Sequence, residues 1–151
     1  MTRKSTWTNA DGLIVGFGPN TPEVTGALAE GEGAVKTAYV HFDYADTGVN
    51  IPLPAGANVV GVVLTVGTAW VGGTDIQVGD GSDADGFVSA SQGATANLTA
   101  GAHIVGGGVY TKGATDTGAQ EFKSYASADT VDVAFTGTFT AGTATLAVSY
   151  L

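Results

Sequence analysis

Glycine constrains the fold of this chain more than any other residue. It occurs 24 times among 151 residues, and each Gly in a helix interior costs about 1 kcal/mol relative to Ala. Val and Thr, whose branched side chains suit pleated strands, number 18 and 21, against 7 Leu. With 44% hydrophobic and 13% charged residues, the chain is too apolar to stay disordered. These features predict an all-β fold, a single-domain β-sandwich of jelly-roll-like type.

The first 33 residues differ from the rest, because Gly and Pro interrupt every periodic run within them. We predict that residues 1–33 form an extended N-terminal arm and that residues 34–151 form the β-sandwich domain. Trp often anchors interfaces, so Trp7 is expected either to dock onto another surface or to fold back onto its own domain. The candidate contact residues on the arm are Arg3, Lys4, Trp7, Leu13 and Ile14.

Apolar residues that alternate with polar ones predict strands in the remaining sequence. This pattern occurs over residues 38–44 and again over 76–78. Residues 59–66 form an almost continuous apolar run, which is typical of a strand buried on both faces. Residues 89–108 are small and polar, and we interpret them as a long loop with one short strand near residues 103–105.

The last third of the chain is expected to contain four strands. Residues 109–111 and 121–125 are predicted to be edge strands. Residues 131–135 and 143–151 alternate between apolar and polar positions, with glycines between the two runs. This arrangement predicts a C-terminal hairpin.

The charge of the chain excludes several classes of partner. Fourteen acidic residues oppose five basic ones, for a net charge of −9. Phosphate contacts need positive charge, so we expect no nucleic-acid partner. No run approaches the roughly 18 apolar residues that cross a bilayer, so no membrane association is expected. The chain has no Cys, which excludes disulfides and thiolate metal sites.

The densest polar segment is residues 75–86, which carry four carboxylates and no base. Oxygen ligands in a Gly-rich loop can hold Ca²⁺, and the candidate ligands are Asp80, Asp83 and Asp85. Their spacing does not fit the EF-hand template. The competing interpretation is a solvated turn, because Asp and Gly both favour turns. We favour the turn and expect neither a metal nor a cofactor.

Nothing in the sequence forms a recognisable catalytic motif. His41 and His103 are the only histidines, and neither has H-x-H or H-E-x-x-H spacing. No G-x-S-x-G segment and no Cys nucleophile occur. A pair of carboxylates could serve glycoside hydrolysis, but spacing within one loop does not establish that geometry. We therefore expect no catalytic residues and no enzymatic activity.

Five segments of turns and strands carry a resemblance to known proteins, namely Phe42–Gly48, Ile51–Ala57, Val59–Val66, Gly72–Phe87 and Thr140–Leu151. They resemble small virion proteins of tailed bacteriophages. The resemblance covers about half of the chain, and its motifs are turns and strands. It implies a β-sandwich that coats or cements a capsid, often as a trimer at local threefold positions.

The resemblance implies a decoration protein with the major capsid protein and copies of itself as partners. Such a protein would be made in the host cytoplasm and would lie on the outer surface of the capsid. A chain with a net charge of −9 suits that surface, because inside the head it would meet the phosphates of packaged DNA. The arm residues named above would then contact the capsid or a neighbouring subunit. A decoration protein would stabilise the shell by binding only its assembled form.

Two other classes of protein fit a similar architecture. A head-fibre, tail or baseplate component would bind a host receptor or another virion protein through the loops at residues 75–86 and 89–108, since loops on rigid scaffolds carry recognition. A trimeric jelly-roll nucleotide hydrolase would need a group of basic residues to hold phosphate. Five scattered bases do not supply that group.

Overall fold

The computed structural model describes residues 5–8, 14–17, 35–112 and 122–151. The chain divides into two compact units, Met1–Ala34 and Val35–Leu151. In the first unit, β1 (Ser5–Thr8) pairs antiparallel with β2 (Ile14–Phe17), with Trp7 opposite Val15.

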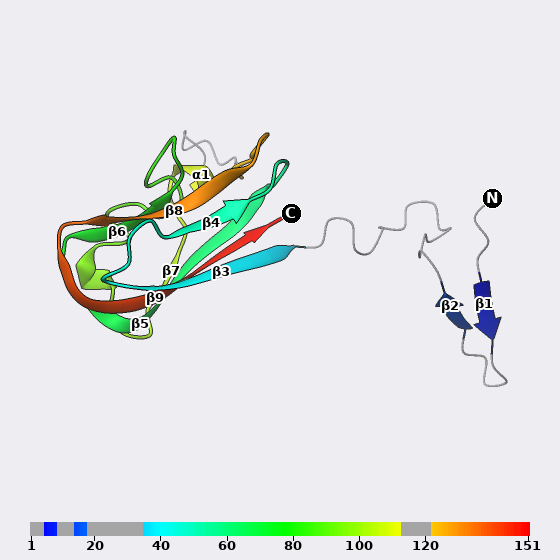
Figure 1. Ribbon diagram of the computed structural model, residues 1–151, viewed down its shortest axis with the longest axis horizontal. Helices are drawn as coiled ribbons and strands as arrows, with labels where there is room; N and C mark the ends of the chain where they lie inside the picture. The colour runs from blue at the N-terminus through cyan, green and yellow to red at the C-terminus, as the bar shows by residue number, and fades with distance from the viewer. Residues whose placement is uncertain (1–4, 9–13, 18–34, 113–121) are drawn as a thin grey trace. The chain divides into compact units, whose positions relative to one another are not determined.

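The second unit consists of two antiparallel sheets that pack face to face, as Figure 1 shows. The first sheet has the order β3-β9-β5-β7, and the second has the order β4-β8-β6. Two short helical turns, η1 and α1, complete the unit. The predicted all-β sandwich is confirmed, whereas its jelly-roll character stays a prediction. The elements are β3 (Lys36–Asp43), β4 (Asn50–Leu53), β5 (Val59–Gly72), β6 (Asp75–Gly79), η1 (Thr95–Asn97), β7 (His103–Val105), α1 (Val109–Lys112), β8 (Asp129–Thr136) and β9 (Phe139–Tyr150).

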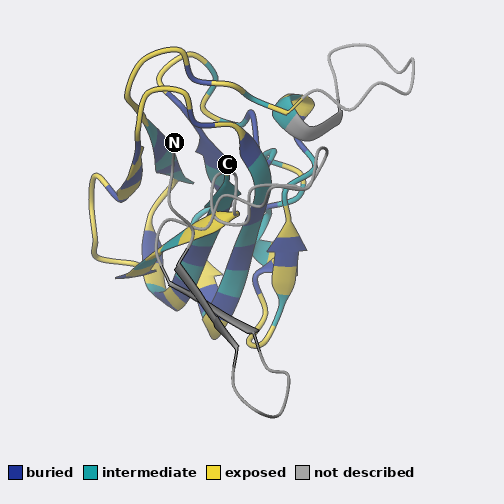
Figure 2. Cartoon of the chain, turned by 90° about the vertical axis from the view of Figure 1, so that its right-hand side faces the viewer, coloured by how far each residue is buried: buried dark blue, intermediate teal, exposed yellow. Residues whose placement is uncertain are grey.

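The core lies between the two sheets. It is built from every second residue along the strands, whose side chains face inward. Leu64 on β5 and Leu146 on β9 are fully buried, as are Ile76 on β6 and Val131 on β8. Figure 2 shows the resulting bands of buried and exposed residues along the strands. Period-two alternation therefore directs one face of each sheet inward and leaves the other available for contacts.

An aromatic cluster closes one end of the core. The Trp70 ring lies with its centroid 5.9, 5.6 and 5.1 Å from those of Phe42, Phe135 and Phe139. Gly142 lies against this cluster with φ +140°, and a Cβ there would come within 2.3 Å of the Trp70 ring. Trp70 is thus buried in the core, and its packing depends on Gly142.

The structure corrects the predictions for two strands. The run 59–66 is buried on one face only, because Gly61, Val63 and Thr65 lie on the outer side of β5 and are half-exposed. The expected C-terminal hairpin does not form. Instead, β8 pairs with β4 and β6, while β9 pairs with β3 and β5. The turn between β8 and β9 thus carries the chain from one sheet to the other.

The predicted edge strands at residues 109–111 and 121–125 are also wrong over the residues that the structure describes. Residues 109–111 lie in the helical turn α1, where the Tyr110 N–H donates to the Gly86 carbonyl at 2.8 Å. Residues 122–125 make a single bridge, between Ser124 and Asn58. The expected short strand near residues 103–105 is confirmed as β7. In the described part of the chain, no helix is long and apolar enough to span a membrane.

Candidate functional site

The outer face of the β3-β9-β5-β7 sheet carries rows of side chains that run across all four strands. One row consists of His41, Thr145, Thr65 and His103, which are consecutive partners in the strand register. His41 Nδ1 and Thr145 Oγ1 are 2.7 Å apart, and Thr65 Oγ1 and His103 Nδ1 are 3.1 Å apart. These hydrogen bonds fix both imidazole rings on the sheet surface.

The next row of this face is apolar and prominent. Tyr39, Ala147, Val63 and Val105 follow one another across the sheet, and the side chains at the two ends, Tyr39 and Val105, are 65% and 63% exposed. The small Ala147 lies between Tyr39 and Val63 in this row. Exposed apolar residues grouped in this way are typical of contact surfaces.

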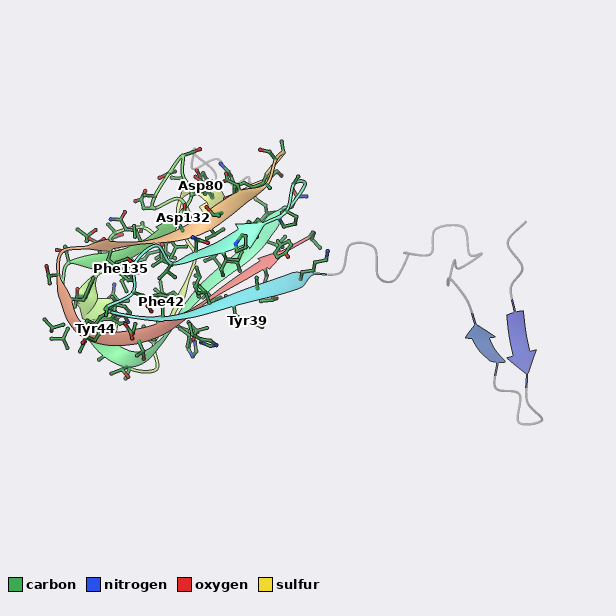
Figure 3. The ribbon with its side chains drawn as sticks, viewed as in Figure 1. Tyr39, Phe42, Tyr44, Asp80, Asp132 and Phe135 are labelled. Carbon is green, nitrogen blue, oxygen red and sulfur yellow. The ribbon has the colours of Figure 1, made fainter. Side chains whose placement is uncertain are left out.

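Charge is divided between the two sides of the sandwich. Apart from Lys36 and Asp43, which lie at the two ends of β3, the four strands of the first sheet carry no charged residue. Figure 3 shows Tyr39 on that side and Asp80 and Asp132 on the opposite side. The second unit thus has one neutral sheet face and one acidic side. Of the eight described carboxylates, six belong to β6, to β8 or to their loops, namely Asp75, Asp80, Asp83, Asp85, Asp129 and Asp132.

Asp80 is the centre of a buried polar network beside the acidic loop. Its Oδ1 accepts hydrogen bonds from the Ser82 and Asp83 N–H groups and from the Tyr110 hydroxyl, each at 2.9 Å. Its Oδ2 accepts one from the Tyr125 hydroxyl at 3.0 Å and lies 3.2 Å from Lys123 Nζ. One carboxylate therefore joins the 80–88 loop to α1 and to the segment before β8.

The ionisation of these groups follows from their burial and hydrogen bonds. Burial opposes ionisation of Asp80, but its hydrogen-bond donors outweigh this effect, and the pKa of Asp80 lies below its ordinary value. Burial, together with the hydrogen bond to Asp80, raises the pKa of Tyr110 and of Tyr125. Burial lowers the pKa of Lys123, but its contacts with Tyr110 and Asp80 outweigh burial, and that pKa is raised. The network is therefore a carboxylate, an ammonium and two neutral phenols over a wide range of pH.

This network changes the interpretation of the candidate calcium ligands. Asp80 is buried rather than solvated, and a cation would have to displace five protein donors from its oxygens. The Asp83 N–H is one of these donors, whereas the carboxylates of Asp83 and Asp85 do not contact Asp80. The pKa of Asp85 is raised, and the main cause is the hydrogen bond between its side chain and that of Asp83. Among the residues that the structure describes, no three acidic or histidine side chains gather closely enough to hold a metal ion.

The candidate arm residues are placed only in part. Trp7 lies in β1 and Ile14 begins β2, while Arg3, Lys4 and Leu13 lie outside the described residues. Sequence reasoning missed Tyr110, Lys123 and Tyr125 as partners of Asp80. They lie 30 to 45 positions away in the chain, and no spacing rule connects them.

Comparison with known proteins gives one informative likeness. No family model matches the chain, and no curated protein matches it either. A solved structure, the cyanophage Pam1 capsid asymmetric unit, matches with a TM-score of 0.51 and 25% identity. The chain resembles a phage virion protein. The match covers 87% of this chain and 95% of the other, so the likeness extends over nearly the whole length of both. It supports the phage virion class expected from the sequence.

Proposed function

We propose that this chain is a decoration protein that binds the outer surface of a phage head and stabilises the shell. The observation that carries the proposal is the match, over 87% of the chain, to a chain of a cyanophage capsid asymmetric unit. The division of charge agrees with this role. A neutral sheet face can contact a protein shell while the acidic side faces solvent.

The proposed partner is the major capsid protein, and the proposed state on the head is a homotrimer. A protein of net charge −9 would be repelled by packaged DNA, which favours the outer surface of the head. Arg3, Lys4, Trp7, Leu13 and Ile14 remain the proposed arm contacts with the capsid or a neighbouring subunit. We propose no enzymatic activity, since each histidine is bonded to a Thr hydroxyl of the sheet and no described carboxylate orients either ring.

The stabilising role can be tested with heads that lack the protein. Purified wild-type chain is added to such heads, and the temperature at which packaged DNA is released is measured. Because binding only to the assembled shell stabilises that shell by mass action, we expect this temperature to rise with protein concentration until the sites are saturated. An unchanged release temperature at saturation would contradict the proposal.

Deletion of residues 1–33 separates this function from a fibre, tail or baseplate role. A decoration protein that uses its arm should lose head binding when the arm is removed. A receptor-binding component should stay attached to the virion while adsorption to host cells falls. The two readouts are particle-bound protein and the rate of adsorption.

A further inference from the structure

Among the described residues, one edge of the β3-β9-β5-β7 sheet has backbone groups without a partner. The Tyr44 N–H donates to the Gly142 carbonyl at 3.1 Å, in register with the β3–β9 ladder. Residues of an antiparallel strand direct their N–H and C=O groups to alternate sides. Even-numbered residues of β3 therefore bond to β9, whereas Thr37, Tyr39, His41 and Asp43 direct theirs to the opposite edge.

The last of these four residues is already capped. The Asp46 carboxylate accepts from the Asp43 N–H at 2.8 Å, and the Asp46 N–H donates to the Asp43 carbonyl at 3.2 Å. Within the described residues, the outward N–H and C=O groups of Thr37, Tyr39 and His41 have no partner. The open stretch thus offers three donors and three acceptors in line.

The other sheet edges are interrupted or covered over part of their length, each by a different device. On β4, the Val133 N–H donates to the Val49 carbonyl, so Pro52 lies at an outward position and has no N–H to offer. The Gln92 side chain donates to the Val105 carbonyl on the outer edge of β7 at 3.3 Å. The outer edge of β6 is bridged by residues 88 and 94.

Natural sheets normally protect their edges with charges, prolines or bulges. The β3 stretch 37–41 contains no charged residue and no proline, and it pairs with β9 without a register shift. Its outward side chains, Tyr39 and His41, belong to the exposed face described above. Backbone groups and side chains therefore form one continuous surface that lacks protection.

We propose that the open edge of β3, from Thr37 to His41, takes up an extended strand of the major capsid protein, which adds a strand to the sheet. This inference rests on the proposed function and names the contact through which the chain would bind the shell. Unpaired N–H and C=O groups in line specify an extended polypeptide, and strand addition of this kind supplies affinity through main-chain hydrogen bonds. Because residues 37–41 contain no charged residue, the added strand needs no basic residues to pair with them.

A second copy of the chain is a less favourable occupant of this edge. Each copy carries a net charge of −9, so free copies repel one another in solution, and the proposed trimer would form only on the head, where contacts with the shell offset this repulsion. Pairing of two β3 edges would bring these charges together, whereas a strand extended from the shell brings only its own segment to the edge.

The test uses full-length protein, heads that lack it, and a Tyr39→Pro variant. Proline removes the outward N–H of residue 39 and is tolerated on edge strands whose N–H faces solvent. Tyr39→Thr is the side-chain control, since it keeps the N–H. Asn50→Pro is the matched edge control, because residue 50 faces the outer edge of β4. Co-sedimentation with heads should show binding by Tyr39→Pro weakened at least about tenfold, or 1.4 kcal/mol, relative to Tyr39→Thr, whereas Asn50→Pro should bind like wild type.

The outcomes separate this inference from the function on which it rests. If wild-type protein does not bind heads, both are overturned. If it binds and Tyr39→Pro binds equally well, only the strand-addition site is overturned. If the free wild-type protein self-associates through an interaction that Tyr39→Pro abolishes, the occupant is a second copy, and the assignment to the shell is wrong.

Amide hydrogen exchange keeps the proposal testable if Tyr39→Pro folds poorly. Exchange over residues 36–43 is compared between free and head-bound wild-type protein. Strand addition should slow exchange of the amides of residues 37, 39 and 41, which have no partner among the described residues. Unchanged exchange of these amides in the bound protein would overturn the proposal.

Discussion

At the scale of single residues, Asp80 decides how the acidic loop is held. Five protein donors surround its two oxygens, and two of them are phenols from distant parts of the chain. Lys123 lies over the Tyr110 ring as well, 4.2 Å from its centroid. The network therefore joins three segments that the strands leave separate.

Removing one phenol hydroxyl should measure the strength of this network. Tyr125→Phe deletes the donor to Asp80 Oδ2 and leaves the ring in the core. Because hydrogen bonds to charged groups contribute about 1.5–3 kcal/mol, we expect the free energy of unfolding to fall by about that amount. Denaturant unfolding would measure it, with Tyr44→Phe, an exposed site, as the control. Equal effects of the two variants would contradict the network.

The same network predicts the pH dependence of stability. The pKa of Asp80 is lowered by folding, so its contribution is present above its unfolded pKa of about 3.9 and is lost as pH falls through the folded value. The pKa values of Lys123, Tyr110 and Tyr125 are raised. Their contribution is present below about pH 10 and is lost as pH rises through the folded values.

We test the acid limb by comparing wild-type protein with Asp80→Asn. The difference in unfolding free energy between them should be constant from about pH 5 to 9 and should shrink as pH falls below about 4. Denaturant unfolding at each pH gives both values. A difference that stays constant down to pH 2 would show that the ionised carboxylate is not the stabilising form.

At the scale of elements, β3 has two unlike edges that a single substitution can distinguish. Val40 bonds to β9, opposite Leu146, whereas Tyr39 faces the open edge. Val40→Pro removes a ladder bond and leaves a buried carbonyl without its donor, which should lower stability by about 2–4 kcal/mol. Tyr39→Pro should have a much smaller effect. Thermal unfolding of both variants checks this, and equal losses would contradict the assigned direction of the backbone groups.

Period-two alternation predicted which residues of a strand face the core, but it did not predict which other strand that strand pairs with. The inward faces of β3 and β6 follow from it directly. The same pattern at residues 131–135 and 143–151 indicated a hairpin, because two neighbouring amphipathic strands look alike in sequence whether they share a sheet or face each other across a core. Alternation carries no information about that choice.

The candidate site was predictable to a similar degree. The sequence indicated Asp80 as part of a polar loop, but its burial depends on donors more than 25 residues away. At residue 110, contact with the 80–88 loop prevails over the strand preference of Val109 and Tyr110. The face around Tyr39 is also set by register, since its four strands come from distant parts of the chain.

At the scale of the whole molecule, the division between a neutral and an acidic side predicts an orientation on the head. Ala147 lies in the middle of the neutral face, opposite Tyr39 and Val63. Ala147→Asp should weaken head binding at least about tenfold, because docking would bury an unpaired carboxylate. Ala134→Asp, opposite Gln77 on the other sheet, is the matched control and should bind normally. Equal binding of both variants would contradict the orientation.

The central claim is that this chain decorates the whole shell, and its copy number in the virion tests that claim most directly. Quantitative mass spectrometry of purified virions would measure the chain against the major capsid protein as an internal standard. A shell-wide decoration protein should give a ratio near one or a simple fraction of it. A handful of copies per particle would contradict the account and would place the chain in a fibre or tail.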